Sequence, residues 1–546
     1  MAATAAAAAA TTTNGALAMT NDTVATANGA RTNGTPATTP NGASATAYGS
    51  PASHHGANGA GDGVPVPGSG RDHVVIFPFM AKGHMLPLLH FATALSAQHG
   101  RSHRLRVTLV TTPGNVAFAR SRLPASVDLV ALPFPSFPPL PAGVESTDAL
   151  PCPTLHLTFM HATGLLRGPF AEFLASLPSP PLALVSDFFL GFTRRVAADA
   201  GVRRVVFNGM SCFASAICKA LAASPPASGF EPGAMIQVPG MPEHVVVRAE
   251  EVPDGVTKRA DPDNPFTRFF MDEIGDSDVR SWGVLSNSFA ALDEAYVPAL
   301  ESFYEAGARA WLVGPLFLAA AGDDIPDGEK EQDPEGCLSW LDERAAAQPG
   351  SVVYVSFGTQ AHITNAQLDE LVHGLLQSGH PFLWAVRSDT WSPPVDVGPN
   401  GRIVRGWVPQ RSVLAHKAVG GFVSHCGWNS VMESLAAGKP MLAWPMIAEQ
   451  HLNARHVANI IGVGVRIALK AGADVVGSAE VEDKVRELMD AECKAAKQMR
   501  ERAAWAQQAA RSAVSHSGTS AMALQKLVEE LQETYDDVVG KGENGV

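Results

Sequence analysis

The chain has 546 residues, of which 46% are hydrophobic, and this length favours two domains over a single core. Its formal net charge of −13 excludes a nucleic acid or an anionic membrane as a partner held by bulk charge. The six cysteines show neither CxxC pairs nor zinc spacing, and no apolar run reaches membrane-spanning length, so we expect a cytoplasmic protein with reduced thiols and no stable membrane insertion.

Residues 1–70 differ in composition from the rest of the chain. They consist mainly of Ala, Thr, Gly, Asn and Pro, with a single Arg (Arg31) and two acids (Asp22 and Asp62). Such a segment buries too little apolar surface to offset chain entropy, so we predict a disordered low-complexity tail. A plastid transit peptide is the alternative, since acids are few and hydroxyls many, but those peptides are usually richer in Arg and Ser.

Strands and helices alternate from Asp72 onwards. His73–Phe79, Arg104–Thr111 and Ala183–Ser186 are apolar runs typical of buried strands, and apolar residues recur at helical spacing after the first of them. Gly83 allows a bend before that helix, and Pro87 fits its first turn. This alternation predicts βαβ units around a parallel sheet, in a first domain spanning residues 71–320.

A second alternation begins at Val352–Phe357 and predicts a second domain over residues 349–516. The polar stretch between the two, residues 321–348, is rich in Asp, Glu and Gly at its start and is interpreted as a linker. The amphipathic pattern of Ala521–Tyr535 predicts a last helix within a C-terminal segment, residues 517–546.

His84 and Asp187 each follow a predicted strand of the first domain. Both therefore lie at the carboxyl edge of a parallel sheet, where open α/β folds bind ligands. A carboxylate beside an imidazole fixes its tautomer and stabilises the cation formed when it takes a proton. The alternatives are a structural loop histidine and an aspartate that caps a helix.

The stretch from Trp407 to Gln450 combines aromatic residues, a strand, a polar turn and a helix start. Gly421–Ser424 predicts a buried strand, and a helix is predicted to begin at Asn429 or Ser430 and to end at Gly438. A helix N-terminus suits a diphosphate. Ser430 and Glu433 also have the spacing of a capping box, and the tryptophans of this stretch are alternatively core residues.

This stretch closely resembles the donor-binding signature of plant UDP-dependent glycosyltransferases, the inverting family with the GT-B fold. The resemblance extends through FMAKGHMLPLL, VSDFFLGF, WLVGPLF and VYVSFGTQ. It implies an α/β protein with two Rossmann-like domains, whose parallel sheets face each other across a cleft. It also implies that the last helix returns to the first domain.

The resemblance assigns roles to individual residues. His84 would be the catalytic base and Asp187 its orienting acid. Trp407 would stack on uracil with Val408, Pro409 and Gln410 nearby. The phosphates would be held by His425, Asn429, Ser430 and Thr359 around the turn at Gly427, the ribose by Glu433, and the sugar by Trp428, Glu449 and Gln450. The sequence departs from the family pattern at Glu449, where Asp is usual, and at Lys439, where a small apolar residue is common.

The function implied is that of a hexosyltransferase. It would move glucose from UDP-glucose to a hydroxyl of a small lipophilic plant metabolite, phenolic or flavonoid-like, without metal or cofactor, and we expect a monomer. Gln450 resembles glucose users, and Trp428 is not the Arg of many glucuronate users. Galactose, xylose and rhamnose remain alternative sugars, and a catalytically silent UDP-sugar-binding protein is the rival class.

Two further motifs suggest other functions. DxD letters at Asp261–Asp263 and Asp276–Asp278 would suit a metal-dependent transferase, but both lie in turn-rich segments. GVGVRI at Gly462–Ile467 lacks the third glycine of a dinucleotide-binding loop. The apolar loops Pro133–Pro151 and Phe188–Phe192 suit a flat acceptor, whose identity and bonding atom (O, N or C) the sequence leaves open.

Overall fold

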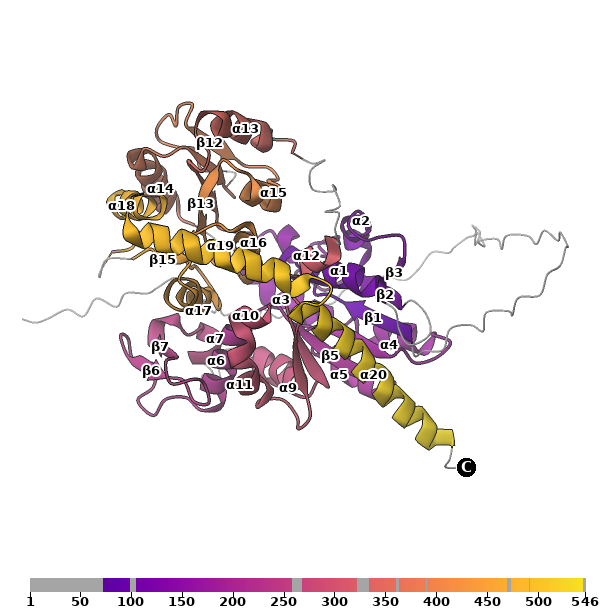
Figure 1. Cartoon of the computed structure of the whole chain (residues 1–546). Helices are drawn as coiled ribbons and strands as arrows, with labels where there is room; N and C mark the ends of the chain where they lie inside the picture. The colour runs from indigo at the N-terminus through magenta and orange to yellow at the C-terminus, as the bar shows by residue number, and fades with distance from the viewer. Residues whose placement is uncertain are drawn as a thin grey trace, which may run out of the picture. The chain divides into compact units, whose positions relative to one another are not determined.

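The structure is a computed structural model that describes residues 72–98, 105–257, 268–321, 333–359, 363–388, 390–468, 473–490 and 492–543. The predicted tail, residues 1–70, lies outside the described residues, as do Arg104 and most of the Asp-rich part of the predicted linker. Within the described residues the chain forms two parallel β-sheets and one short antiparallel pair, with helices between the strands (Figure 1).

The first sheet is seven-stranded within the described residues, in the order β3-β2-β1-β4-β5-β8-β9. All of its strand pairs are parallel. The strands are β1 (His73–Phe77), β2 (Arg106–Thr111), β3 (Val127–Ala131), β4 (Ala183–Asp187), β5 (Arg203–Asn208), β8 (Gly283–Ser286) and β9 (Arg309–Leu312). The antiparallel pair is β6 (Met235–Gln237) with β7 (Val246–Arg248).

The second sheet is six-stranded over the described residues, in the order β12-β11-β10-β13-β14-β15, again with parallel pairs. Its strands are β10 (Val352–Ser356), β11 (Phe382–Ala385), β12 (Gly401–Val404), β13 (Val419–Ser424), β14 (Met441–Ala443) and β15 (Gly464–Arg466). The predicted strands at 73–79, 183–186, 352–357 and 421–424 are therefore confirmed, with end points shifted by a few residues.

Helices connect the strands. They are α1 (Lys82–Ser96), α2 (Val116–Arg120), α3 (His156–Gly164), α4 (Arg167–Ala175), α5 (Phe192–Asp199), α6 (Cys212–Ala223), α7 (Asp254–Thr257), α9 (Asp276–Val279), α10 (Ala290–Asp293), α11 (Val297–Glu301), α12 (Leu316–Ala321), α13 (Cys337–Ala347), α14 (Asn365–Ser378), α15 (Gln410–Ala415), α16 (Trp428–Ala437), α17 (Gln450–Arg455), α18 (Ser478–Met489), α19 (Lys494–Val514) and α20 (Thr519–Glu543). Two π-helical turns, η6 (Phe270–Gly275) and η9 (His456–Ile461), and several short 3-10 turns complete the described chain.

Each sheet is buried on both faces, which explains why its strands are apolar runs without alternation. In β1, Val75 and Phe77 belong to one core cluster, whereas Val74 and Ile76 belong to another. In β10, Val352 and Tyr354 point to one face of the sheet and pack with α13, α15, α16 and α19. Val353 and Val355 point to the other face and pack with α14 and α18. Figure 1 shows α14 and α18 side by side, in agreement with their extensive contacts.

Two helices bear on the predicted domain limits. Cys337 and Leu341 of α13 are fully buried in the core of the second sheet, so we propose that the linker ends before Cys337 rather than at residue 348. The predicted C-terminal helix is present as α20, and Leu524, Leu527 and Val528 pack in a core cluster of the first sheet. The limits at residues 320 and 516 stay predictions.

Candidate functional site

The first half of the site lies at the carboxyl edge of the first sheet. β1 and β4 are hydrogen-bonded neighbours, with Phe77 opposite Ser186, so the segments that follow them leave the sheet side by side. His84, in the first turn of α1, and Asp187, the last residue of β4, are thereby brought together: Nδ1 of His84 lies 2.8 Å from Oδ2 of Asp187. Asp187 is fully buried, and its other oxygen accepts a hydrogen bond from the Phe189 N–H at 3.0 Å.

The imidazole of His84 has an aromatic environment, and its Nε2 has no hydrogen-bond partner among the described residues. Its side chain is 26% exposed and lies among the rings of Phe79, Phe188 and Phe189, with centroids 5.2–6.2 Å away. Burial lowers the pKa of His84, but the charge and hydrogen bond of Asp187 outweigh burial, and the net pKa is raised. Because Nδ1 faces Asp187, Nε2 is the nitrogen left to accept a proton, as a general base requires.

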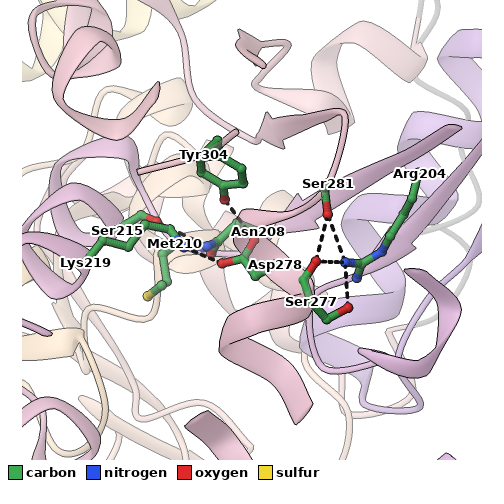
Figure 2. Close-up of polar contacts among 9 residues, drawn as sticks. All are labelled: Arg204, Asn208, Met210, Ser215, Lys219, Ser277, Asp278, Ser281 and Tyr304. Atoms are coloured by element: carbon green, nitrogen blue, oxygen red, sulfur yellow. Dashed lines mark hydrogen bonds and ion pairs between the residues drawn. The ribbon is translucent and has the colours of Figure 1, made fainter. Parts of the chain in front are cut away.

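A buried arginine supports Asp187 from behind. Arg204 of β5 is 2% exposed, and its guanidinium donates to the backbone carbonyl of Asp187 at 3.1 Å and to Ser186 Oγ at 2.8 Å. Figure 2 shows the other end of the same guanidinium, which donates to Ser277 O and Ser281 Oγ, each at 3.0 Å. The five donors of one planar group thus fix the end of β4 against the segment after η6. No local pattern in the sequence marks Arg204, because its acceptors come from two distant parts of the chain, residues 186–187 and 277–281.

Asp278, in the second DxD motif, is part of a buried network (Figure 2). Its carboxylate accepts a hydrogen bond from Tyr304 Oη at 2.8 Å and forms an ion pair with Lys219. The pairing of the buried Asp278 with the partly buried Lys219 indicates a structural role for this motif. Asp261–Asp263 lies outside the described residues.

The second half of the site surrounds the turn between β13 and α16. Cys426 in this turn has φ +63°, a strained conformation for a non-glycine residue that is often found at functional sites. The ring of His425 lies so close to Gly358 and Gly427 that a Cβ at either position would be 2.6 or 2.5 Å from its Nε2. Burial lowers the pKa of His425 to about 4, so the ring is neutral near pH 7 and can donate one hydrogen bond.

Helix α16 begins at Trp428, with Gly427 as its N-cap, and ends before Gly438, whose φ is +67°. The predicted end is confirmed, but the predicted start is late by one or two residues. Ser430 is therefore the third residue of the helix, and the capping-box interpretation of Ser430 and Glu433 is wrong. The first intrahelical bond runs from the Val431 N–H to Gly427 O, so the N–H groups before it have no intrahelical acceptor and suit an anion.

The side chains of Ser430 and Glu433 meet at Gln410 instead. Nε2 of Gln410, the first residue of α15, donates to Ser430 Oγ at 2.9 Å and to Glu433 Oε2 at 2.7 Å. Oε1 of Gln410 accepts from the hydroxyl of Tyr354 at 3.2 Å. Three residues that the sequence analysis placed in one site are thus joined by direct hydrogen bonds.

Trp407, Val408 and Pro409 occupy the short connection between β12 and α15, directly before Gln410. Trp407 is half-buried, whereas the other two tryptophans of the predicted stretch are almost completely buried. Thr359 is exposed and follows Gly358, at the carboxyl end of β10. β10 and β13 pair with Ser356 opposite Ser424, so Thr359 and His425 leave neighbouring strand ends.

Trp428 lies in the core, so its side chain is not available to a sugar. Its indole is 2% exposed, stacks on His456 of η9 at 5.9 Å with an interplanar angle of 4°, and donates to Asn287 O at 2.9 Å. The predicted sugar contact of this side chain is therefore not supported, and Trp428 can contribute only its backbone N–H. The contacts that bury the indole come from residues remote in sequence.

Glu449 and Gln450 lie where the connection after β14 enters α17. Ala448 just before them has φ +53°, a second strained residue within the site. Oε1 of Gln450 accepts from the N–H groups of Met446 and Ile447, each at 3.0 Å, which shapes this loop. Glu449 is half-buried, accepts from Asn453 at 3.2 Å and has its pKa raised by burial, with the charge of His84 acting in the opposite direction.

The two halves of the site are in contact. Nδ2 of Asn429, the second residue of α16, donates to the carbonyl of Gly83 at 2.6 Å. Gly83 directly precedes His84, and Glu449 contributes to raising the pKa of His84. The polar groups at the carboxyl edges of both sheets therefore lie next to each other and form one candidate site. Lys439, the other departure from the family pattern, donates to His416 O and Val419 O and lies outside it.

Two parallel α/β sheets that meet through the groups at their carboxyl edges form the GT-B architecture. Comparison with solved structures agrees. Glycyrrhiza uralensis UGT73P12 complexed with glycyrrhetinic acid 3-O-monoglucuronide matches with a TM-score of 0.74 and 30% identity, over 86% of this chain and 98% of that one. Phytolacca americana UGT2 complexed with UDP-2fluoro-glucose and pterostilbene matches with a TM-score of 0.69 and 26% identity, over 84% and 99%.

Sequence comparisons identify the family. Residues 313–539 match the family described as UDP-glucoronosyl and UDP-glucosyl transferase. An Arabidopsis thaliana flavonol 3-O-glucosyltransferase is 38% identical over 72% of this chain and 84% of its own length. UDP-glycosyltransferase 90A1 of the same plant is 37% identical over 85% and 97%. The chain belongs to the plant UDP-glycosyltransferases and is a glycosyltransferase. In the described part of the chain, no helix has the length and apolarity needed to cross a membrane.

Proposed function

We propose that this glycosyltransferase moves glucose from UDP-glucose to a hydroxyl of a small aromatic acceptor, with inversion at the anomeric carbon. The observation that carries the proposal is the hydrogen bond between His84 and the buried Asp187. A neutral alcohol is a poor nucleophile, and a base of this kind contributes about 10²–10⁴-fold to such a reaction.

In the proposed reaction, Nε2 of His84 takes the proton of the acceptor hydroxyl while the oxygen attacks C1 of the sugar. The bond from C1 to the phosphate oxygen breaks on the opposite face, and its electron pair leaves with UDP. Asp187 stabilises the imidazolium that forms, and the N-terminus of α16 stabilises the negative charge of the leaving diphosphate. The proton and the electron pair are thus each received by a group in place before the reaction starts.

The donor is proposed to lie along the carboxyl edge of the second sheet. Trp407 would stack on uracil next to Val408 and Pro409, and Glu433, held by Gln410, would bind the ribose hydroxyls. The phosphates would take the N–H groups at Gly427, Trp428 and Asn429, together with Ser430, His425 and Thr359. Glu449 and Gln450 would bind the sugar hydroxyls. The free N–H groups of α16 and the hydrogen bonds of Gln410 support this placement.

The acceptor is proposed to be a flavonoid or a related flat phenol. Phenyl rings dominate the surroundings of His84. The half-buried Phe189 lies 5.2 Å from its ring and the half-buried Phe270 lies 6.2 Å from Phe189, while the buried Phe79 and Phe159 support the half-buried Phe134 from the core. Flat aromatic molecules pack well against such rings. Relatives point the same way: one is named an anthocyanin 3'-O-beta-glucosyltransferase, from Gentiana triflora, and Arabidopsis thaliana UGT89C1 has been solved in complex with quercetin.

The test is release of UDP from UDP-glucose, UDP-galactose and UDP-xylose in the presence of a panel of flavonols and simple phenols. We expect turnover with UDP-glucose and at least one phenolic acceptor, and loss of about 10²-fold or more in His84→Ala. UDP binding to His84→Ala, measured by calorimetry, should stay close to that of the unmodified protein.

Two outcomes would contradict the proposal. Near-normal turnover of His84→Ala would exclude His84 as the base. UDP-glucose binding without UDP release from any acceptor would favour the silent sugar-nucleotide-binding protein.

A further inference from the structure

We infer that Pro87 and Asn429 together couple the donor-binding turn to the catalytic base, with Asn429 as a positioning residue for His84. The inference rests on the proposed function, because it assumes that His84 is the base and that the donor binds at α16. It gives Pro87 a role in α1, the helix that carries the base. It also gives the side-chain amide of Asn429 a second role besides donor binding.

Pro87 interrupts the backbone hydrogen bonding of α1. The helix begins at Lys82, so Pro87 lies in its second turn, not in the first turn as predicted from the sequence. In a helix the N–H of residue 87 would bond to the carbonyl of residue 83, but proline has no N–H. The carbonyl of Gly83, one residue before His84, therefore lacks the backbone N–H donor that a helix would normally give it.

The carbonyl of Gly83 accepts a hydrogen bond from the side chain of Asn429. Nδ2 of Asn429 donates to Gly83 O at 2.6 Å, across 346 residues of sequence. A Cβ added to Gly83 would lie 3.9 Å from the same Nδ2, so the amide approaches the backbone at the residue where no side chain intervenes. The carbonyl released by Pro87 is thereby satisfied from the second sheet.

The hydrogen bond between Asn429 and Gly83 links the donor-binding turn to the residue before His84. A side-chain amide has two N–H groups and one oxygen, so one N–H on Gly83 leaves the other free for the donor. Asn429 is the second residue of α16, where the proposed diphosphate binds. A donor that orders this turn therefore also fixes Gly83 and, through it, the position of His84 relative to C1 of the sugar. Misplacement of a reacting group by about 1 Å costs about 10²-fold in rate.

The experiment is a double-mutant cycle with Pro87→Ala, Asn429→Ala and the combined variant. Pro87→Ala restores an N–H that competes for Gly83 O from within α1. We expect its kcat at saturating UDP-glucose to fall about 10- to 100-fold, while the Kd for UDP stays within about 2-fold because no donor-binding group has changed. In the Asn429→Ala background the same change should have almost no further effect on kcat, because the bond is already absent.

The control is Pro298→Ala. Pro298 is exposed in the first turn of α11, where a missing N–H removes no helical bond, so its kcat should be unchanged. If Pro87→Ala does not fold, Pro87→Val restores the same N–H with a side chain closer in volume to the buried proline.

Wild-type kcat in a folded Pro87 variant, or kcat losses that multiply in the double variant, would overturn the inference. Both outcomes leave the assignment of His84 intact, which the His84→Ala variant tests separately.

Discussion

His84 and Asp187 lie 103 residues apart in sequence, and their side chains are joined by a hydrogen bond of 2.8 Å between Nδ1 and Oδ2. The pairing follows from the order of the first sheet, in which β1 and β4 are neighbours although β2 and β3 lie between them in sequence. Asp187 acts on His84 in two ways: it fixes which nitrogen faces the acceptor, and it raises the pKa of the imidazole above the value that burial alone would give.

Asp187→Asn should separate these two effects in a pH profile. The base must be neutral to act, so activity falls at low pH as His84 becomes protonated. Removing the carboxylate charge lowers the pKa of His84, so the acidic limb of kcat/KM should move to lower pH. The maximal rate should fall about 10²-fold or more, because the imidazolium formed on proton transfer loses its stabilising charge.

The measurement is kcat/KM for UDP-glucose and a phenolic acceptor from about pH 5 to pH 9, a range that spans the ordinary histidine pKa. An acidic limb that stays in place, or moves to higher pH, would show that Asp187 does not raise the pKa of His84.

The sequence predicted the carboxyl-edge placement of this pair because apolar strands followed by polar turns are local patterns. The same holds for the strand–turn–helix unit of the second sheet and for the end of α16 at Gly438. The start of α16 was misplaced because Gly427 caps it with an extended backbone and no side-chain hydrogen bond, which leaves no capping signal. The burial of Trp428 depends on His456 and Asn287, and no local pattern reports contacts with residues so distant in sequence.

The position of Pro87 in its helix differs from the first-turn position that the sequence predicts. A proline four residues after Gly83 implies an unpaired carbonyl only once α1 is known to start at Lys82. The position of a helix start decides which backbone groups need partners from outside the helix. The contact with Asn429 therefore became visible only in the structure.

Arg204→Gln should lower kcat more than it changes KM. Arg204 holds the carbonyl of Asp187 and the hydroxyl of Ser186, so its loss loosens the end of β4 that presents the carboxylate. We expect a kcat loss of about 10-fold, since displaced reacting groups are costly even when they are not removed. Arg204→Lys should not restore activity, because one ammonium group cannot reproduce the planar set of donors.

Arg203→Gln is the matched control for Arg204→Gln. Arg203 is the adjacent residue of β5, and its guanidinium lies 5.9 Å from the ring of Trp282. The control should keep nearly full kcat. Full activity in Arg204→Lys, with a melting temperature like that of the unmodified protein, would show that Asp187 does not depend on the geometry of Arg204.

Gln410→Leu should raise the KM for the UDP-sugar with little change in kcat. The amide of Gln410 orients Glu433, whose proposed contact is to the ribose, a part of the donor that does not react. Contacts of equal strength in the ground state and the transition state affect KM alone, and we expect about a 10-fold increase.

Gln508→Leu on α19 is the control, because Gln508 is exposed and bonds only to Ser512 among the described contacts. Initial rates over a range of UDP-glucose concentrations give both constants. A fall in kcat without a change in KM would place Gln410 in the reaction step instead of in donor binding.

Glu251→Gln should destabilise the protein, because Glu251 is a buried carboxylate held by two arginines of the second sheet and its helices. The side chain is 3% exposed, accepts from Arg455 Nε at 2.6 Å and forms an ion pair with Arg466. Burial raises the pKa of Glu251, but hydrogen bonds from the Arg248 N–H and from both arginines outweigh burial, and the pKa is lowered. Removing one partner of a buried ion pair costs about 3–5 kcal/mol, and we expect the lower end because Arg466 is 28% exposed.

The pH dependence of this stabilisation has a defined sign. A carboxyl whose pKa is lowered by folding stabilises the protein above its unfolded pKa of about 4.3, and this contribution is lost as the pH falls through the lower folded value. The difference in melting temperature between the Glu251→Gln variant and the unmodified protein should therefore be full at pH 7 and shrink below about pH 4. Asp128→Asn is the control, since its ion pair with Arg106 is about half exposed and such pairs contribute only about 0–1 kcal/mol. A Glu251→Gln variant that melts like Asp128→Asn at pH 7 would show that this ion pair adds no stability, and a difference that grows as the pH falls would contradict the lowered pKa.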